Sequence, residues 1–157
     1  MTDQRSEGKA SQLNPIFEYL APLVGEWETE GRHPLFASMV PGHASFEWLE
    51  GEALLRWHSA FEQPGPPRGF SVIGRDDTLG TCQILYSDER GVSRIYEMSL
   101  EDGLWRFWRN APGFPQRFTG VFSEDGNTIT SHGEFSRDGS TWEPDLDVIY
   151  RKTGARG

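Results

Sequence analysis

Residues 82–150 read CQILYSDERGVSRIYEMSLEDGLWRFWRNAPGFPQRFTGVFSEDGNTITSHGEFSRDGSTWEPDLDVIY. Short apolar runs in this stretch are separated by turn signals at Glu89-Arg90-Gly91, Asp102-Gly103, Asp125-Gly126 and Asp138-Gly139. Asp-Gly between two alternating runs is a strong hairpin signal, because a type I′ turn requires positive φ at both central residues. We therefore predict that this stretch forms five consecutive antiparallel strands.

Pairing the strands through these turns sorts their side chains onto two faces. The apolar face would pair Ile84 with Tyr96, Tyr86 with Arg94, Cys82 with Met98, Met98 with Phe107, Leu100 with Trp105, Tyr96 with Arg109, Phe122 with Ile129, Phe118 with Gly133, Phe135 with Trp142 and Ser131 with Leu146. The polar face would pair Gln83 with Glu97, Ser99 with Arg106, Thr119 with His132, and His132 with Asp145. A slip of one residue would mix the faces, so agreement among the hairpins supports this register.

The first half of the chain predicts a short helix followed by further strands. Asn14 and Pro15 are typical of an N-cap and a first helical position, and a helix this short must pack on something apolar. Strands are predicted over Gly25–Gly31, His43–Leu49, Glu52–Phe61 and Phe70–Arg75. A two-residue turn at Glu50-Gly51 would place Phe46 opposite Leu55, Trp48 opposite Ala53, Ala44 opposite Trp57, Ser45 opposite Arg56 and His43 opposite His58.

These segments amount to about ten strands, with no second layer of helices to cover a sheet. Such a sheet closes on itself or folds as a sandwich, and the succession of short hairpins favours closure. We therefore predict an all-β, antiparallel, up-and-down barrel with the helix capping one end. Eight strands can enclose one small ligand, and ten leave more room.

Length, charge and cysteine content narrow the protein class. The chain has 157 residues, a formal net charge of −9 and one cysteine, Cys82. We expect one domain over residues 12–152, with disordered tails at 1–11 and 153–157. The acidity argues against binding nucleic acid or anionic membrane surfaces, and one cysteine excludes an internal disulfide. Without a signal peptide or a long apolar run, a cytoplasmic protein is expected, and a possible homodimer stays open.

Residues 20–31 read LAPLVGEWETEG, in which a helix end runs into a Gly-x-Trp strand. In this the chain resembles the lipocalin-like, or calycin-type, barrels. It is similar in particular to small bacterial ten-stranded barrels of unknown function and to their relatives, the nitrobindins. Further shared points are Gly31 followed closely by Pro34, the turn Asp76–Gly80 and the ending Ile149-Tyr150-Arg151. The resemblance implies a lipocalin-like barrel.

The resemblance also bears on the cofactor. Nitrobindins ligate haem iron through a histidine in the last strand, a few residues before a closing arginine. The corresponding residues 143–151 here read EPDLDVIYR and contain no histidine. The resemblance therefore implies no haem ligation by that route, and we expect neither a cofactor nor a metal.

Arg94, Tyr96 and Arg109 form the sharpest candidate site, because the register places them side by side on the apolar face. A buried arginine needs a partner, and no inward acid is adjacent in this register. The partner is either an acidic ligand, bound as a carboxylate or phosphate, or water, if both arginines lie at the barrel mouth. The expected cavity wall comprises Trp57, Tyr96, Phe107, Phe118 and Trp142.

Other titratable residues give weaker signals. His33 lies in a loop that could border the cavity, so it joins the binding candidates. His43 and His58 offer only two metal ligands, both on the outer face, and His132 beside Asp145 resembles a base and its orienting acid without a nucleophile. Solvated or core positions are expected for the remaining candidates, which are Glu26, Glu28, Glu30, Asp147 and Cys82.

The function favoured by the sequence is binding of a small, mostly apolar ligand inside the barrel, with an acidic group met by Arg94 or Arg109. One alternative is an enzyme of isomerase or cyclase type that acts on a hydrophobic small molecule. In that case the barrel enforces a substrate conformation, and Tyr96 or His33 donates a proton. The other alternative is a structural barrel filled by its own side chains. The sequence favours binding over catalysis.

Overall fold

The computed structural model describes residues 15–49 and 53–153. The elements are α2 (Pro15–Leu20), η1 (Ala21–Leu23), β1 (Gly25–Arg32), β2 (Val40–Trp48), β3 (Leu55–Phe61), β4 (Gly69–Arg75), β5 (Cys82–Asp88), β6 (Ser93–Glu101), β7 (Leu104–Arg109), β8 (Gln116–Phe122), β9 (Thr128–Ser136), β10 (Trp142–Pro144) and β11 (Asp147–Lys152).

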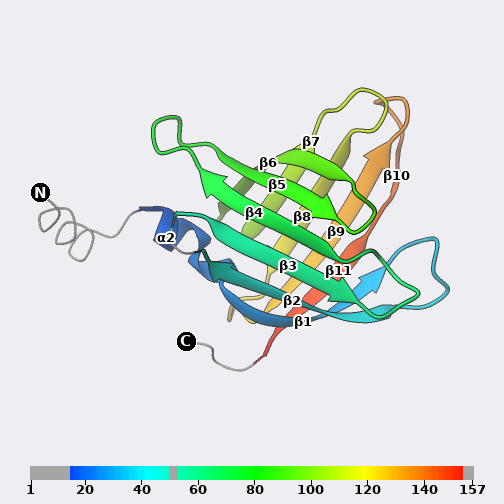
Figure 1. Ribbon diagram of the computed structural model, residues 1–157, viewed down its shortest axis with the longest axis horizontal. Coiled ribbons are helices and arrows are strands. Elements are labelled where there is room, and N and C mark those ends of the chain that lie inside the picture. Colours follow the sequence, from blue (N-terminus) through cyan, green and yellow to red (C-terminus); the bar gives the residue numbers. More distant parts are fainter. Residues whose placement is uncertain (1–14, 50–52, 154–157) are drawn as a thin grey trace, which may run out of the picture.

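Ten of these strands form a closed, antiparallel, up-and-down barrel (Figure 1). Each strand from β1 to β8 pairs with the next along the chain, β9 pairs with β11, and β11 pairs with β1 to close the ring. The short strand β10 pairs with β9 beyond the point where β11 leaves it. Prediction of an all-β antiparallel barrel of about ten strands with a short N-terminal helix is confirmed.

The Asp-Gly hairpins use two turn geometries. Asp102 and Gly103 both have positive φ, at 54° and 75°, as a type I′ turn requires. At the two later turns only the glycine has positive φ, and the aspartate carboxylate accepts hydrogen bonds from backbone N–H groups that follow it. Asp125 and Asp138 thus stabilise their turns through the side chain. The hairpins are confirmed, but type I′ geometry is wrong for these two.

The register predicted for β5 to β9 is confirmed over most of its length. The observed pairs include Cys82 with Met98, Ile84 with Tyr96, Tyr86 with Arg94, Met98 with Phe107, Leu100 with Trp105, Phe118 with Gly133 and Phe122 with Ile129. The polar pairs Gln83–Glu97, Ser99–Arg106 and Thr119–His132 are also present. Residues 82–150 comprise seven strands rather than five, because loop 110–115 separates β7 from β8 and the last segment is split.

The predicted register between β2 and β3 is wrong by two residues. Phe46 pairs with Trp57, and Ser45 rather than His43 lies opposite His58. The connection is longer than two residues, since the Leu49 N–H bonds to the Leu54 carbonyl; the predicted turn itself lies outside the described residues. A shift of two keeps every side chain on its predicted face, because the side-chain period in a strand is two.

The predicted register at the end of the ladder is wrong by one residue at β10, which changes faces, and by two residues at β11, which does not. Trp142 pairs with Ser136 instead of Phe135, and Ser131 pairs with Val148 instead of Leu146. Between β10 and β11 the chain bulges, held by a hydrogen bond from the Asp145 N–H to the Gly133 carbonyl. The bulge adds one residue to this strand relative to β9, and a single extra residue reverses the alternation beyond it. Asp145 consequently turns toward the barrel interior, and His132 pairs with Asp147.

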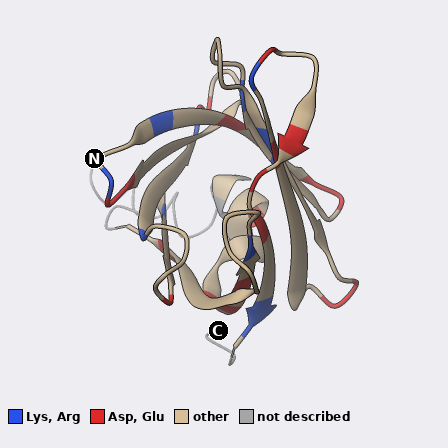
Figure 2. Cartoon of the chain, turned by 90° about the vertical axis from the view of Figure 1, so that its right-hand side faces the viewer, with Lys and Arg blue, Asp and Glu red and all other residues tan. Residues whose placement is uncertain are grey.

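Large side chains fill the barrel at the end where the helix lies. Trp27, Phe46 and Trp105 are buried there with Leu20 and Leu23, and the Trp27 indole donates to the Leu23 carbonyl (3.0 Å). Each such side chain contributes about 1.5–3 kcal/mol through removal of its apolar surface from water. Figure 2 shows the ring of strands end-on, with the helix lying across it. This filled end leaves the opposite end for a pocket.

The N-terminal helix is tied to the barrel by its own side chains. Pro15 is its first residue, as predicted, whereas Asn14 and the predicted tail at 1–11 lie outside the described residues. Tyr19 accepts a hydrogen bond from the Leu100 N–H (2.8 Å), and the Arg75 guanidinium lies 4.9 Å from its ring centroid. Among the described residues, no helix is long and apolar enough to cross a membrane.

Candidate functional site

A pocket of about 740 Å³ occupies the barrel end opposite the helix. Inward-facing side chains of the strands form its floor, and the loops after β1, β3 and β7 contribute to its rim. Its volume lies within the range of small-molecule sites, and most of its lining is apolar or aromatic. The rim contributes Pro34, Phe36, Pro66, Pro67 and Phe114. The barrel is therefore filled at one end and hollow at the other.

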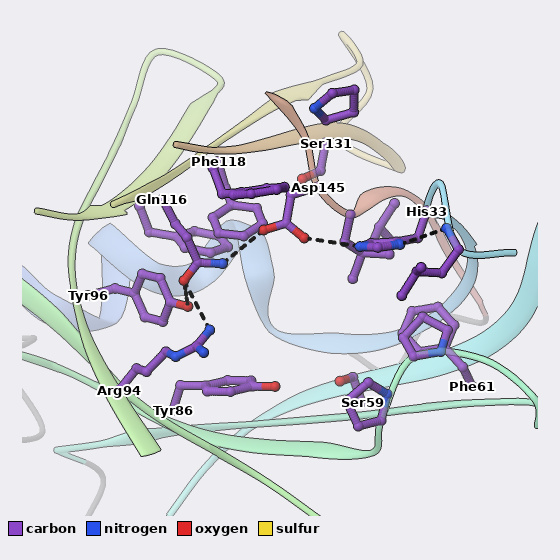
Figure 3. A pocket seen from close by; sticks show the side chains of 18 of the residues that line it. His33, Ser59, Phe61, Tyr86, Arg94, Tyr96, Gln116, Phe118, Ser131 and Asp145 are labelled. Atoms are coloured by element: carbon purple, nitrogen blue, oxygen red, sulfur yellow. Dashed lines mark hydrogen bonds and ion pairs between the residues drawn. The ribbon is translucent and has the colours of Figure 1, made fainter. Parts of the chain in front are cut away.

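All but two of the predicted binding residues line this pocket. The lining includes His33, Trp57, Arg94, Tyr96, Phe107 and Phe118 (Figure 3 labels several of them). Trp142 lies elsewhere: its ring stacks on the Arg117 guanidinium (3.8 Å), which pairs with Glu134 on the outer face. Placing Trp142 in the wall is therefore wrong, because its strand is offset from the predicted register. Arg109 also lies outside the lining.

The aromatic residues of the floor form one connected network. Phe107 stacks on Phe118 at 4.6 Å and makes edge contacts with Trp57 (5.7 Å) and Tyr96 (5.6 Å). Tyr96 in turn makes an edge contact with Tyr86. Such ring pairs add about 0.5–1.5 kcal/mol each to the energy of their burial. The pocket therefore has an interlocked, apolar floor.

One side of the pocket carries a hydrogen-bonded chain centred on Gln116 (Figure 3). Its carbonyl oxygen accepts from the Tyr96 hydroxyl (2.8 Å) and from Arg94 Nη1 (3.2 Å), and its amide nitrogen donates to Asp145 Oδ2 (2.9 Å). Arginine can only donate and a carboxylate only accepts, so the partners fix the orientation of the amide. Gln116 is 5% exposed and lies at the start of β8.

Asp145 and His33 continue this chain. His33 Nδ1 accepts from the Leu35 N–H (3.1 Å), so the ring proton of the neutral form lies on Nε2, which faces Asp145 Oδ1 at 3.5 Å. Both ring nitrogens are therefore engaged. The His33 and Asp145 side chains are 23% and 15% exposed. Expecting no inward acid was wrong, because the bulge after β10 turns Asp145 inward.

Arg94 is the cation of the pocket that lacks an acidic partner. In the described part of the chain no carboxylate lies within ion-pair distance of it; it contacts the Gln116 carbonyl oxygen and the Phe114 ring (5.2 Å). Two other lining arginines are neutralised, Arg90 by Asp88 and Arg137 by Glu143. Arg94 thus presents unused N–H donors and an uncompensated charge beside the cavity.

Arg109 lies behind the site. It pairs with Gln116 across the β7–β8 ladder, and its guanidinium carbon lies 5.9 Å from the Tyr96 ring centroid. Its Nε is buried and makes no hydrogen bond within the described ranges. Arg109 therefore adds positive charge behind Tyr96 without reaching the pocket. The prediction treated Arg94 and Arg109 as equivalent, but only Arg94 lines the pocket.

Burial holds the tyrosine hydroxyls of the site in their protonated form. It raises the pKa of Tyr96, against the opposing effect of Arg94, and it alone raises the pKa of Tyr150 above its usual range. Burial and a hydrogen bond to Asp88 (2.6 Å) raise the pKa of Tyr86. Burial opposes ionisation of Asp88, but hydrogen bonds from Arg90 and Tyr86 hold its pKa well below the usual range. The phenols are therefore hydrogen-bond donors at neutral pH.

The other titratable candidates lie outside the pocket. His43 contacts Glu26 (2.5 Å) and His132 contacts Asp147 (2.7 Å), all on the outer face. His132 beside Asp145 was thus the wrong pair, since the break in the last strands shifts the register. Over residues 15–49 and 53–153, no group of three or more His, Cys, Asp or Glu is placed to hold a metal ion.

Two central residues of the site, Gln116 and Asp145, were missing from the predicted site residues. Alternation from the predicted inward Phe118 puts Gln116 on the same face, so its placement was accessible from sequence. Asp145 follows Pro144, and a proline within a strand marks an interruption of the ladder. The size of the resulting bulge, and hence the face of Asp145, had no signal in the sequence.

The arrangement defines a class, the closed ten-stranded antiparallel barrel, and comparison with known proteins shows the same fold. A solved structure, Rv2717c from M. tuberculosis, is similar with a TM-score of 0.61 over 91% of this chain and 100% of that chain, at 12% identity. A protein of unknown function of the DUF3598 family from Nostoc punctiforme covers 85% of this chain and 97% of its own, at 7% identity; its TM-score of 0.29 is below the level of a shared fold. No family model and no curated protein matches the chain. The barrel and the first likeness fit a calycin-like fold.

Proposed function

We propose that this protein binds a small, mostly apolar molecule in the barrel pocket, with an acidic group of that molecule placed against Arg94. The observation that carries the proposal is the cavity of about 740 Å³, whose aromatic floor meets polar groups on one side. Apolar walls with a few convergent polar groups are the usual composition of small-molecule sites.

The state of Arg94 supports an acidic group on the ligand. Its guanidinium is half-buried and has a neutral acceptor, Gln116, as its hydrogen-bond partner. A carboxylate or phosphate bound there would gain a charge-assisted and potentially bidentate contact. Arg109 would strengthen the positive potential from behind Tyr96.

The enzymatic alternative has less support in the geometry. His33 was expected as a proton donor, but one ring nitrogen accepts from a backbone N–H and the other faces Asp145. The Tyr96 hydroxyl donates to Gln116. Proton transfer to a ligand from either residue would first have to break these contacts, so binding is the function that the pocket supports best.

The proposal is tested with two probes that share an alkyl chain, dodecanoate and dodecanol. Either probe should change the intrinsic tryptophan fluorescence, because Trp57 lies in the pocket wall. Dodecanoate should bind about tenfold more tightly than dodecanol, because dodecanol cannot make the charge-assisted contact with Arg94. Arg94→Gln should abolish the preference for the acid. The control Arg106→Gln, on the exposed outer face, should keep it.

Two results would contradict the proposal. Absence of any fluorescence change or calorimetric heat with both probes, and with the more rigid 2-naphthoate, would remove the binding function. An unchanged preference for dodecanoate in Arg94→Gln would leave binding in place but reject Arg94 as the contact for the acid.

A further inference from the structure

Asp145 is an anion in the pocket wall with little compensation. Over the described ranges, no lysine or arginine lies within ion-pair distance of its carboxylate; its contacts are the Gln116 amide (2.9 Å) and His33 Nε2 (3.5 Å). The other acid of the pocket lining differs, since Glu143 is paired with Arg137. A carboxylate offers about four acceptor positions, so Asp145 retains unused ones.

Gln116 separates this anion from the cation of the site. Its carbonyl end faces Arg94 and its amino end faces Asp145, so one side-chain amide lies between the two charges. Both flanking side chains line the pocket (Figure 3). A bound molecule whose acidic group contacts Arg94 therefore places its next few atoms near the carboxylate.

We infer that the ligand carries a hydrogen-bond donor, a hydroxyl or an amine, a few atoms from its acidic group, and that Asp145 accepts this donor. The inference rests on the proposed function and narrows its ligand class to apolar acids with a neighbouring donor. A simple monocarboxylic acid would drive water from Asp145 without replacing its hydrogen bonds, and its charge would repel that of Asp145. A hydroxy or amino acid supplies the missing donor and removes that penalty.

The test compares dodecanoate with 2-hydroxydodecanoate and 3-hydroxydodecanoate in calorimetric titrations of the full chain. The wild-type protein should bind at least one hydroxy acid about tenfold more tightly than dodecanoate, since a hydrogen bond to a charged group is gained. Asp145→Asn should reduce this preference to within about twofold. Asp147→Asn, the matched control on the outer face two residues away, should retain it.

The outcomes separate the two claims. If the wild-type protein binds dodecanoate and both hydroxy acids equally, the inference is overturned and the proposed function stands. A preference that persists in Asp145→Asn also overturns it. If none of the three acids binds, the proposed function fails and the inference fails with it. The comparison within the wild-type protein decides the question even if Asp145→Asn does not fold.

Discussion

Replacing Gln116 by leucine should reveal how strongly the polar chain couples Tyr96 to the barrel. Gln116 is 5% exposed and makes three side-chain hydrogen bonds, so the replacement leaves three polar groups without their partner. Arg94 and Asp145 border the pocket and can be rehydrated. The Tyr96 hydroxyl, on a side chain that is 5% exposed, is less able to do so.

The magnitude follows from that difference. A buried donor without a partner costs about 1–3 kcal/mol, so we expect Gln116→Leu to lower the free energy of unfolding by about 2 kcal/mol. Tyr96→Phe removes the hydroxyl while Gln116 still accepts from Arg94, and should cost about 1 kcal/mol. In the double variant no hydroxyl is stranded. The two effects should therefore fall short of additivity by about 1 kcal/mol.

Urea unfolding followed by tryptophan fluorescence measures all four members of this cycle. The control Gln83→Leu changes an exposed glutamine on the outer face that pairs with Glu97, and should alter stability by less than about 0.5 kcal/mol. Additive effects of Gln116→Leu and Tyr96→Phe would show that the hydrogen bond between them contributes nothing, and would refute the reasoning.

Three further predictions concern packing, the thiol and acid stability. Gly133→Ala should lower the free energy of unfolding by about 1–3 kcal/mol in the same urea assay, because the new methyl group would lie 2.5 Å from the Phe118 ring. The control Gly74→Ala should cost less, because its methyl group meets only the end of the exposed Leu54 side chain. Burial raises the pKa of the Cys82 thiol to about 11, so a disulfide reagent at pH 8 should label it only after denaturant is added; rapid labelling of the folded protein would contradict this. Backbone hydrogen bonds lower the pKa of Asp138 to about 2, so the stability that its carboxylate contributes is present above about pH 4 and is lost as the pH falls toward 2. In thermal unfolding, Asp138→Ala should therefore reduce the loss of stability between about pH 4 and about pH 2. The same loss in the variant as in the wild-type protein would show that the Asp138 carboxylate does not stabilise the turn.

The sequence by itself determined the barrel and the inner face of most strands. Alternation and turn residues are local, and each Asp-Gly turn fixes the pairing of the two strands beside it. That is why Arg94, Tyr96, Phe107 and Phe118 could be placed together. The two-residue error between β2 and β3 left Trp57 facing inward, because an even shift does not change faces.

Only the tertiary structure decided which residues complete the site. An alternating pattern holds as far as the strand is continuous, and the bulge between β10 and β11 resets it. This break turns Asp145 inward and leaves Trp142 outside. The contact between His33 and Asp145 joins two loops far apart in the chain, at the barrel end where several loops meet. No local pattern specifies such a meeting, because it depends on how the whole ring closes.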